Sequence, residues 1–299
     1  DGSGLARGVA SDHVWVTGNW NFIANIEVRN SPQQGILVSG ANNNTLFGVI
    51  THGNHGSGIQ LMDSNNNRLE NIITYDNFDS ANTRGQTGQD ADGIGISSGD
   101  GNVIYNCVSY FNSDDGVDLW KSTNSLIDGC ISFSNGRGAY GNGNGFKLGG
   151  PVVNNSTIQR SIAFANKAAG ITSNGGQQIS IVNNTSFGNS GSNFQGSTSS
   201  TFRNNISESG RVNQNGASGQ NNSWDLGLQA SGFASIDPAN PLFLSLSATS
   251  PARGAGTPNV SVPYAGSAPD LGALQFPQTW AERLGNQLFD MEEAIGRTR

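Results

Sequence analysis

Four aspartates and one lysine occupy matching positions of a recurring pattern in the middle of the chain. The pattern contains a glycine followed by a hydrophobic residue, and Asp92 and Asp115 each stand one residue before that glycine. Asp118 and Lys147 each stand two residues after it, and Asp114 adds a further carboxylate. Carboxylates held close together repel one another unless a cation balances them. Ca²⁺, which takes roughly six to eight oxygen ligands, is the ion that this group is expected to bind.

Histidine and cysteine do not contribute to this group. The three histidines, His13, His52 and His55, fall outside its register, so a zinc site is not expected. Cys107 and Cys130 lie 23 residues apart at one register position. We expect two buried, stacked thiols there, with a disulfide as the alternative.

An internal repeat places these positions on one surface. Each copy contains an aromatic residue, one further residue and an asparagine before the glycine-hydrophobic pair. The asparagines are separated by 23, 35, 23, 31 and 23 residues, at Asn54, Asn77, Asn112, Asn135, Asn166 and Asn189. Each basal unit of 23 holds three short β-branched stretches bounded by Asn, Gly and Ser, without a helical period. This pattern predicts an all-β chain folded as a parallel β-helix.

In such a fold, equivalent residues of successive coils stack at about 4.8 Å. The repeated asparagines are expected to hydrogen-bond to one another along the axis and to tolerate left-handed backbone. The aromatic position is expected to form a stack inside the coil, with His52 replacing the aromatic in one copy. Its members are Tyr75, Tyr110, Phe133, Phe164 and Phe187.

The longer spacings mark two insertions beside the aspartates. About 12 extra residues fall at 79–90 and about 8 at 137–144. Extra loops on one face of a solenoid are where such proteins carry binding sites. The insertions therefore support a functional site at this corner.

The end of the chain differs from the repeat. We expect residues 1–279 to form the β-helix catalytic domain, with an irregular, proline-rich end from about residue 237. From Trp280 the hydrophobic residues recur every three or four positions, which predicts an amphipathic helix over 280–299. The helix is expected to cap an open end of the coil or to pack on its flank.

The overall composition excludes several function classes. Glycine accounts for 42 of 299 residues, charged residues for only 12%, and the net charge is −7. Lysine and arginine form no run, so nucleic acid is not an expected partner. No apolar run approaches the ~18 residues of a membrane span.

Three segments that carry these residues resemble polysaccharide lyase family 9, the right-handed parallel β-helix pectate lyases. They read DADG at 90–93, NSDDGVDL at 112–119 and GNGFKLGG at 143–150. The likeness is specific over about 90–150 and looser over about 19–210. It implies that Asp92, Asp114, Asp115 and Asp118 bind Ca²⁺ and that Lys147 is the catalytic base.

The resemblance implies a secreted, monomeric enzyme that cleaves an acidic polysaccharide by β-elimination. Pectate is the expected substrate, with rhamnogalacturonan or another uronate polymer as the alternative. Lys147 must be neutral to take a proton, although Asp118 alone would raise its pKa. The Ca²⁺ ion must therefore outweigh Asp118, which predicts an alkaline pH optimum.

Other residues and two rival functions complete the hypothesis. Arg137 and Tyr140, in the insertion nearest Lys147, and Arg84 are expected to bind substrate carboxylates, with Lys121 and Lys167 as further candidates. One rival is a β-helix glycoside hydrolase that uses aspartates as acid and base. The other is a non-catalytic, glycan-binding β-helix. Only a lyase generates an unsaturated sugar end.

Overall fold

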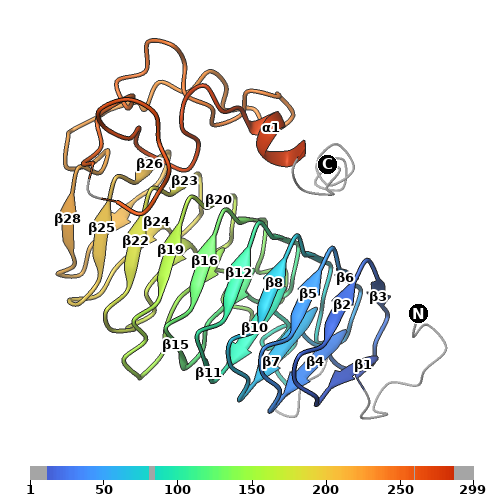
Figure 1. The fold of residues 1–299 in the computed structure, drawn as a ribbon. Helices are drawn as coiled ribbons and strands as arrows, with labels where there is room; N and C mark the ends of the chain where they lie inside the picture. The colour runs from blue at the N-terminus through green and yellow to red at the C-terminus, as the bar shows by residue number, and fades with distance from the viewer. Residues whose placement is uncertain (1–11, 81–84, 259, 286–299) are drawn as a thin grey trace.

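Three long parallel sheets run side by side along one axis. The computed structural model describes residues 12–80, 85–258 and 260–285, and each turn of the chain adds one strand to each sheet (Figure 1). Sheet 1 contains β1 (Val14–Val16), β4 (Ile36–Ser39), β7 (Ile59–Met62), β10 (Ile94–Ser97), β14 (Val117–Asp118), β18 (Phe146–Lys147), β21 (Ala169–Thr172), β24 (Ser192–Gln195) and β27 (Val212–Asn213).

The other two long sheets have the same construction. Sheet 2 contains β2 (Phe22–Ala24), β5 (Thr45–Phe47), β8 (Arg68–Glu70), β12 (Val103–Tyr105), β16 (Leu126–Asp128), β19 (Thr157–Gln159), β22 (Ser180–Val182), β25 (Thr201–Arg203) and β28 (Ser218–Gln220). Sheet 3 contains β3 (Glu27–Arg29), β6 (Ile50–His52), β9 (Ile73–Tyr75), β13 (Val108–Tyr110), β17 (Ile131–Phe133), β20 (Ile162–Phe164), β23 (Thr185–Phe187) and β26 (Ile206–Glu208). A short pair, β11 (Gly99–Asp100) and β15 (Ser122–Thr123), lies at one corner. The predicted parallel β-helix is confirmed.

The strands are short because residues with left-handed backbone end many of them. Asn25 follows β2 with φ of 55°, Asn30 follows β3 with φ of 58°, and Gly40 follows β4 with φ of 60°. Asparagine and glycine adopt this conformation at the lowest cost. The Asn and Gly residues of the repeat therefore turn the chain from one sheet to the next.

The six repeated asparagines form a continuous ladder inside the coil. The Nδ2 of Asn54 donates to Oδ1 of Asn77 at 2.8 Å, and the same bond recurs up to Asn189 at 2.9 to 3.1 Å. The predicted ladder is confirmed, but its asparagines are not the left-handed residues. That conformation belongs to the residue before each of them, with φ from 51° to 63°, at Gly53, Asp76, Phe111, Ser134, Ala165 and Gly188.

The aromatic stack lies on the outer face of sheet 3, so the prediction that it fills the coil was wrong. Side chains alternate across a strand. In β13 the Ser109 hydroxyl donates to the carbonyl of Gly116, beside the asparagine ladder, and Tyr110 points the other way. Neighbouring rings in the stack are 4.5 to 5.0 Å apart, in the order His52, Tyr75, Tyr110, Phe133 and Phe164.

The interior of the coil is filled by aliphatic side chains and two cysteines. Cys107 and Cys130 are buried in this core together with Ile104 and Ile127. Both thiols are free, and the amide N–H of Cys107 points at the sulfur of Cys130 across 3.4 Å. The predicted thiol stack is confirmed.

The strand register locates both insertions. Ile50 pairs with Ile73, 23 residues on, whereas Ile59 pairs with Ile94, 35 residues on, so 12 extra residues lie between β9 and β10. The second insertion was predicted as one block of eight. Val117 pairs with Phe146, 29 residues on, and Leu126 pairs with Thr157, 31 residues on. Six extra residues therefore precede β18, and two follow it.

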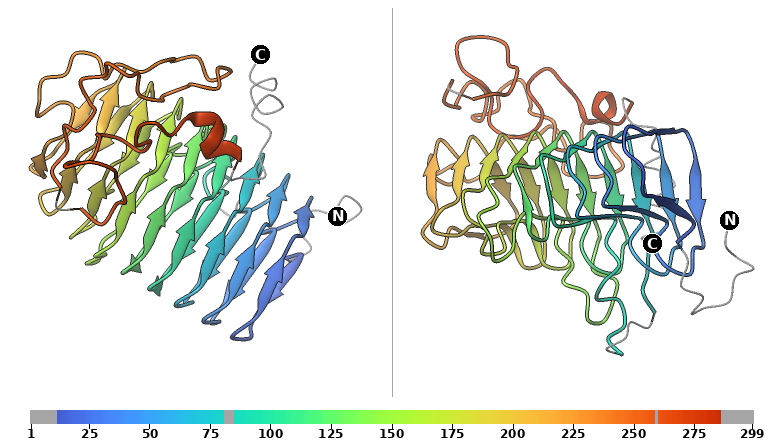
Figure 2. Two further views of the ribbon diagram at one scale, coloured as in Figure 1. Left: turned by 45° about the horizontal axis from the view of Figure 1, so that its top comes forward. Right: turned by 60° about the horizontal axis from the view of Figure 1, so that its bottom comes forward.

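The segment after β28 turns back along the outer face of sheet 3 (Figures 1 and 2). Its Phe243 and Trp280 pack edge-on against Phe164, at 5.1 and 6.2 Å between ring centroids, and bury that end of the aromatic stack. The helix α1 (Trp280–Gly285) closes this segment, and Arg283 donates to the carbonyls of Arg160 and Ala273.

The helix α1 therefore packs on the flank of the coil. The part of the predicted helix beyond residue 285 lies outside the described residues. Within the described ranges, no helix is both long and apolar enough to cross a membrane.

Candidate active site

The predicted register of the aspartates and the lysine is confirmed. Gly95 of β10 pairs with Asp118 of β14, and Asp118 pairs with Lys147 of β18. The row continues to Thr172 of β21. Two consecutive coils of sheet 1, those of β14 and β18, therefore place Asp118 and Lys147 side by side on one face.

A second row, three residues earlier in each coil, carries Asp92 and Asp115. The amide N–H of Asp115 donates to Oδ1 of Asp92 at 3.1 Å. Both the amide N–H and the Nδ2 of Asn144 donate to Oδ1 of Asp115, at 2.6 and 2.9 Å. The amide of Ala169 donates in turn to Oδ1 of Asn144 at 3.1 Å. This row fixes the orientation of both carboxylates through their Oδ1 atoms.

The two rows meet at the ammonium group of Lys147. Its Nζ donates to Oδ2 of Asp118 at 2.8 Å and lies 3.1 Å from Oδ2 of Asp115. One carboxylate oxygen from each of Asp92, Asp115 and Asp118 lies within 4.8 Å of the others, and all three residues are buried. We call these three aspartates the carboxylate cluster.

The cluster is electrostatically unbalanced. Burial raises the pKa of Asp92 well above 3.8, and Asp114 adds to the increase. Burial raises the pKa of Asp118 to about 7, although Lys147 opposes the shift. Burial and the nearby Asp115 raise the pKa of Asp114 to about 8. A single ammonium group therefore does not neutralise these carboxylates.

The pKa of Lys147 results from two opposing effects. Burial of the ammonium group lowers it, which is the largest single effect. Asp115, Asp118 and Asp92 act in the opposite direction and together raise it above its ordinary value. With no cation on the carboxylates, Lys147 is thus held in its protonated form.

The donor set fits a hard divalent cation. Oδ1 of Asp118 and Oδ2 of Asp115 are buried and accept no hydrogen bond from the described part of the chain beyond the ion pair with Lys147. A Cβ added at Gly95 would lie 2.4 Å from Oε1 of Gln60 and 3.2 Å from Oδ2 of Asp92, so the glycine keeps an oxygen-lined space open beside the cluster. Carboxylate and amide oxygens are the ligands that Ca²⁺ prefers.

Asp114 lies beside the cluster rather than within it. One of its carboxylate oxygens accepts a hydrogen bond from the amide of Asn142, in the second insertion. Its negative charge adds to the raised pKa of Asp92. Its predicted role as a fourth ligand stays a prediction.

The two insertions pack against each other next to the cluster (Figure 2). The amide of Tyr140 donates to the carbonyl of Thr87, and the amide of Gly138 donates to the carbonyl of Ser113. A Cβ on Gly88 would lie 2.3 Å from Cα of Gly138, so this contact requires glycine. Together the parts of the two insertions that the structure describes project as a wall from the corner that precedes sheet 1.

The two predicted substrate-binding residues that the structure describes, Arg137 and Tyr140, are not members of the carboxylate cluster. Arg137 forms an ion pair with Asp76 at 2.6 Å and lies over the Phe111 ring, so it contacts the turns that follow β9 and β13. Tyr140 is 58% exposed on the wall. Arg84 lies outside the described residues. Their predicted roles stay predictions.

The two remaining candidate cations are also placed. Lys121 lies with its Nζ 5.9 Å from the centre of the Trp120 ring. Lys167 donates to the carbonyls of Gly138 and Gly141 at 3.0 and 2.8 Å, so it supports the second insertion. Neither contact involves the carboxylate cluster.

Three residues near the cluster were not predicted to belong to the site. Asn144 was visible in the sequence as the register equivalent of Asp92 and Asp115. Gln60 was visible in the same way, because it stands two residues after Gly58 and pairs with Gly95, in the row of Asp118 and Lys147. Trp120 gave no such signal, because it lies outside these two rows. The Lys147 ammonium lies 5.8 Å from the centre of the Trp120 ring, and Trp120 is 39% exposed beside the cluster.

Comparisons with known proteins agree with this geometry. The sequence profile of the Pel9A-like, right-handed β-helix region matches residues 2–222. Pectate lyase L of Dickeya chrysanthemi is 37% identical over 300 aligned positions, which cover 89% of this chain and 69% of the relative. Pectate lyase L of Dickeya dadantii (strain 3937) has the same identity and coverage.

Two solved structures have a similar fold. The crystal structure of pectate lyase Pel9A superposes with a TM-score of 0.78 at 34% identity, over 87% of this chain and 72% of that one. A rhamnogalacturonan lyase superposes with a TM-score of 0.67 at 26% identity, over 78% of this chain and 72% of that one.

Proposed function

This chain belongs to the Pel9A-like family of right-handed β-helix proteins, and on that premise we propose that it cleaves pectate by β-elimination. It is a polysaccharide lyase that acts on a polymer of uronic acids. The observation that carries the proposal is the contact of Lys147 with Asp115 and Asp118 inside an unbalanced carboxylate cluster.

We assign the cation site to Asp92, Asp115 and Asp118, with Asp114 beside them. When bound there, Ca²⁺ would neutralise a uronate carboxylate and make the C5 proton of that sugar more acidic. Asn144 supports the site by fixing the Asp115 carboxylate through two hydrogen bonds. Support of this kind orients a ligand before the ion arrives.

Lys147 acts as the general base. In the elimination, the C5 proton passes to Nζ of Lys147, the C4–oxygen bond breaks, and its electron pair leaves with the glycosidic oxygen. A double bond then joins C4 and C5. Lys147 must be neutral for this step. Asp115, Asp118 and Asp92 keep it protonated as long as no cation balances their negative charge. Once the carboxylates are engaged by a cation, burial remains as the effect that lowers the pKa of Lys147.

The proposal extends to substrate and location. Pectate is favoured because both Dickeya relatives, at 37% identity, and the Pel9A structure are pectate lyases. Rhamnogalacturonan is the second candidate, since one similar structure is a rhamnogalacturonan lyase. A polymer of plant cell walls requires an enzyme outside the producing cell, and we propose a secreted monomer.

Product analysis tests the function. The purified protein is incubated with polygalacturonate, rhamnogalacturonan or alginate in the presence of Ca²⁺, and the ultraviolet absorbance of unsaturated sugar ends is followed. Absorbance is expected to rise on polygalacturonate and to be lost in Lys147→Ala. New reducing ends without absorbance would show a hydrolase, and neither signal on any polymer would show a binding protein.

A further inference from the structure

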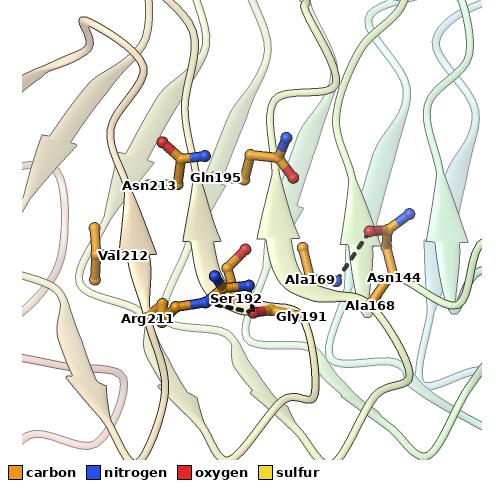
Figure 3. Close-up of a pocket in the computed structure, with 9 residues that line it drawn as sticks. All are labelled: Asn144, Ala168, Ala169, Gly191, Ser192, Gln195, Arg211, Val212 and Asn213. Carbon is orange, nitrogen blue, oxygen red and sulfur yellow. Dashed lines mark hydrogen bonds between the residues drawn. The ribbon is translucent and has the colours of Figure 1, made fainter.

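A pocket of ≈ 370 Å³ lies on sheet 1, beyond Lys147 toward the C-terminal coils (Figure 3). We propose that Arg211 in this pocket binds the carboxylate of a second uronate unit of the polymer, distant from the bond that is cleaved. The proposal rests on the proposed function, because it assumes that a uronate polymer is the ligand.

The position of the Arg211 guanidinium is fixed by the backbone. Its Nε and Nη2 both approach the carbonyl oxygen of Gly191, at 3.3 and 3.0 Å. A guanidinium has five N–H donors, so this attachment leaves others for a ligand. None of the described residues that line the pocket is acidic, and Arg211 therefore gives it a positive charge. An exposed, oriented guanidinium suits a carboxylate, which it contacts in a planar, paired geometry.

The pocket is continuous with the site of chemistry. Asn144 lines the pocket and also donates two hydrogen bonds to Asp115 of the carboxylate cluster. Figure 3 shows Asn144 at one side of the pocket and Arg211 near the other. A polymer that leaves the cluster toward the C-terminal coils would therefore enter this pocket.

The strand register provides the path between the two sites. Lys147 is followed in the same row by Thr172, Gln195 and Asn213 on the next three coils. Three steps at the strand spacing amount to about 14 Å. Thr172 is buried, whereas Gln195 and Asn213 are exposed, uncharged and polar. These two side chains therefore offer hydrogen bonds to sugar hydroxyls between a charged site at each end.

The carboxylate cluster is negatively charged and the Arg211 pocket is positively charged, so the two sites interact differently with an acidic polymer. The carboxylate cluster repels a polyanion until a cation is bound there, whereas Arg211 attracts one without any cation. Arg211 should therefore contribute to substrate binding and not to proton transfer. Its effect should appear only with substrates long enough to reach it.

Steady-state kinetics of Arg211→Gln test the subsite, with oligogalacturonates from disaccharide to hexasaccharide and with polygalacturonate. The matched control is Arg68→Gln, because Arg68 lies on sheet 2 and pairs with Glu70. We expect Arg211→Gln to raise KM about threefold to tenfold on the longest substrates, the loss of one charge-assisted contact. The kcat and the KM for the shortest cleaved substrate should stay unchanged, as should all values for Arg68→Gln.

Two results would overturn the subsite: an unchanged KM at every length, or an equal increase at every length. A separate measurement distinguishes its failure from failure of the proposed function. Calorimetric binding of hexagalacturonate to Lys147→Ala, with and without Arg211→Gln, needs no cleavage. Weaker binding in the double variant, together with a wild-type protein that yields no unsaturated product from any polymer, would retain the subsite and reject the lyase.

Discussion

Asp115 and Asn144 hold equivalent positions on neighbouring coils, and two N–H groups of Asn144 converge on one oxygen of Asp115. The second oxygen of Asp115 then faces Lys147 at 3.1 Å. An asparagine in the register position of the aspartates thus turns a carboxylate toward the cluster. The chemistry of the site is built on the same coil-to-coil hydrogen bonding that holds the β-helix together.

Removal of Ca²⁺ should abolish activity and lower the free energy of unfolding. An ion that binds only the folded state stabilises it by about 2.7 kcal/mol at a hundredfold excess over Kd. Activity and thermal unfolding are measured after exhaustive chelation and again after Ca²⁺ is restored. Full activity in the chelated protein would reject the metal assignment.

Asp115→Ala should weaken Ca²⁺ binding by more than tenfold, or over about 1.4 kcal/mol. Asp76→Ala is the matched control, because Asp76 is also in a turn of the repeat but pairs with Arg137. Calcium titrations by calorimetry compare the two variants. Equal affinities would show that the carboxylate cluster is not the binding site.

Lys147→Ala should fold and bind Ca²⁺ while kcat falls by about 10²- to 10⁴-fold, the usual contribution of a general base. KM should change little. Lys147→Arg should be nearly as inactive, because a guanidinium keeps its proton. An active arginine variant beside an inactive alanine variant would assign Lys147 a charge-balancing role instead.

The calcium-free protein should lose stability as the pH rises from about 4 to 9. The folded state raises the pKa of Asp118 to about 7 and of Asp114 to about 8, above the ordinary value of 3.8. Their stabilising contribution is complete below pH 3.8 and is lost as the pH rises through 7 and 8. Lys147, with its raised pKa, stays protonated throughout and adds no slope.

Calcium affinity should rise over the same pH range, because the carboxylates must lose their protons to bind the ion. Denaturant unfolding in chelator and calcium titrations at several pH values measure both effects. Asp118→Asn should reduce both slopes. A calcium-free protein whose stability increases between pH 5 and 9 would contradict the prediction.

Phe164→Ala should destabilise the protein by about 3–5 kcal/mol, the usual cost of removing a buried aromatic side chain. Phe164 contacts Phe133 within the stack and Phe243 and Trp280 of the covering segment. Phe22→Ala is the control, since Phe22 is 70% exposed. Limited proteolysis should cut the segment after residue 221 faster in Phe164→Ala alone. Equal cleavage of both variants would argue against the covering contact.

The coil period, the asparagine ladder and the register of Asp118 with Lys147 could be predicted from the sequence, because residues one repeat apart in a solenoid lie next to each other on neighbouring coils. The side of the sheet on which the aromatic residues lie could not be predicted in this way. A strand of three residues offers one inward and two outward positions, and Tyr110 could be placed only once Ser109 was seen to point inward. The final segment that covers this stack has no repeat to reveal it.

The residues of the candidate site could likewise be predicted only in part. Residues in register, such as Asp92 and Asp115, could be grouped from spacing alone. Gln60 belongs to the row of Asp118 and Lys147, because it pairs with Gly95 of β10, so its place was also open to prediction from spacing. Trp120 approaches the Lys147 ammonium from outside this row, through the conformation of its side chain. Arg137 sits in the predicted insertion, but its pairing with Asp76 depends on how that insertion folds.

The carboxylate cluster and Lys147 occupy only three consecutive coils, those of β10, β14 and β18, in a sheet of nine strands. Each coil of a solenoid contacts mainly its two neighbours. Gain or loss of one complete coil beyond β21 would therefore leave the aspartates and the lysine in place. In-frame duplication of a coil would therefore lengthen the polymer-binding surface in steps of about 4.8 Å. The catalytic residues would stay unchanged.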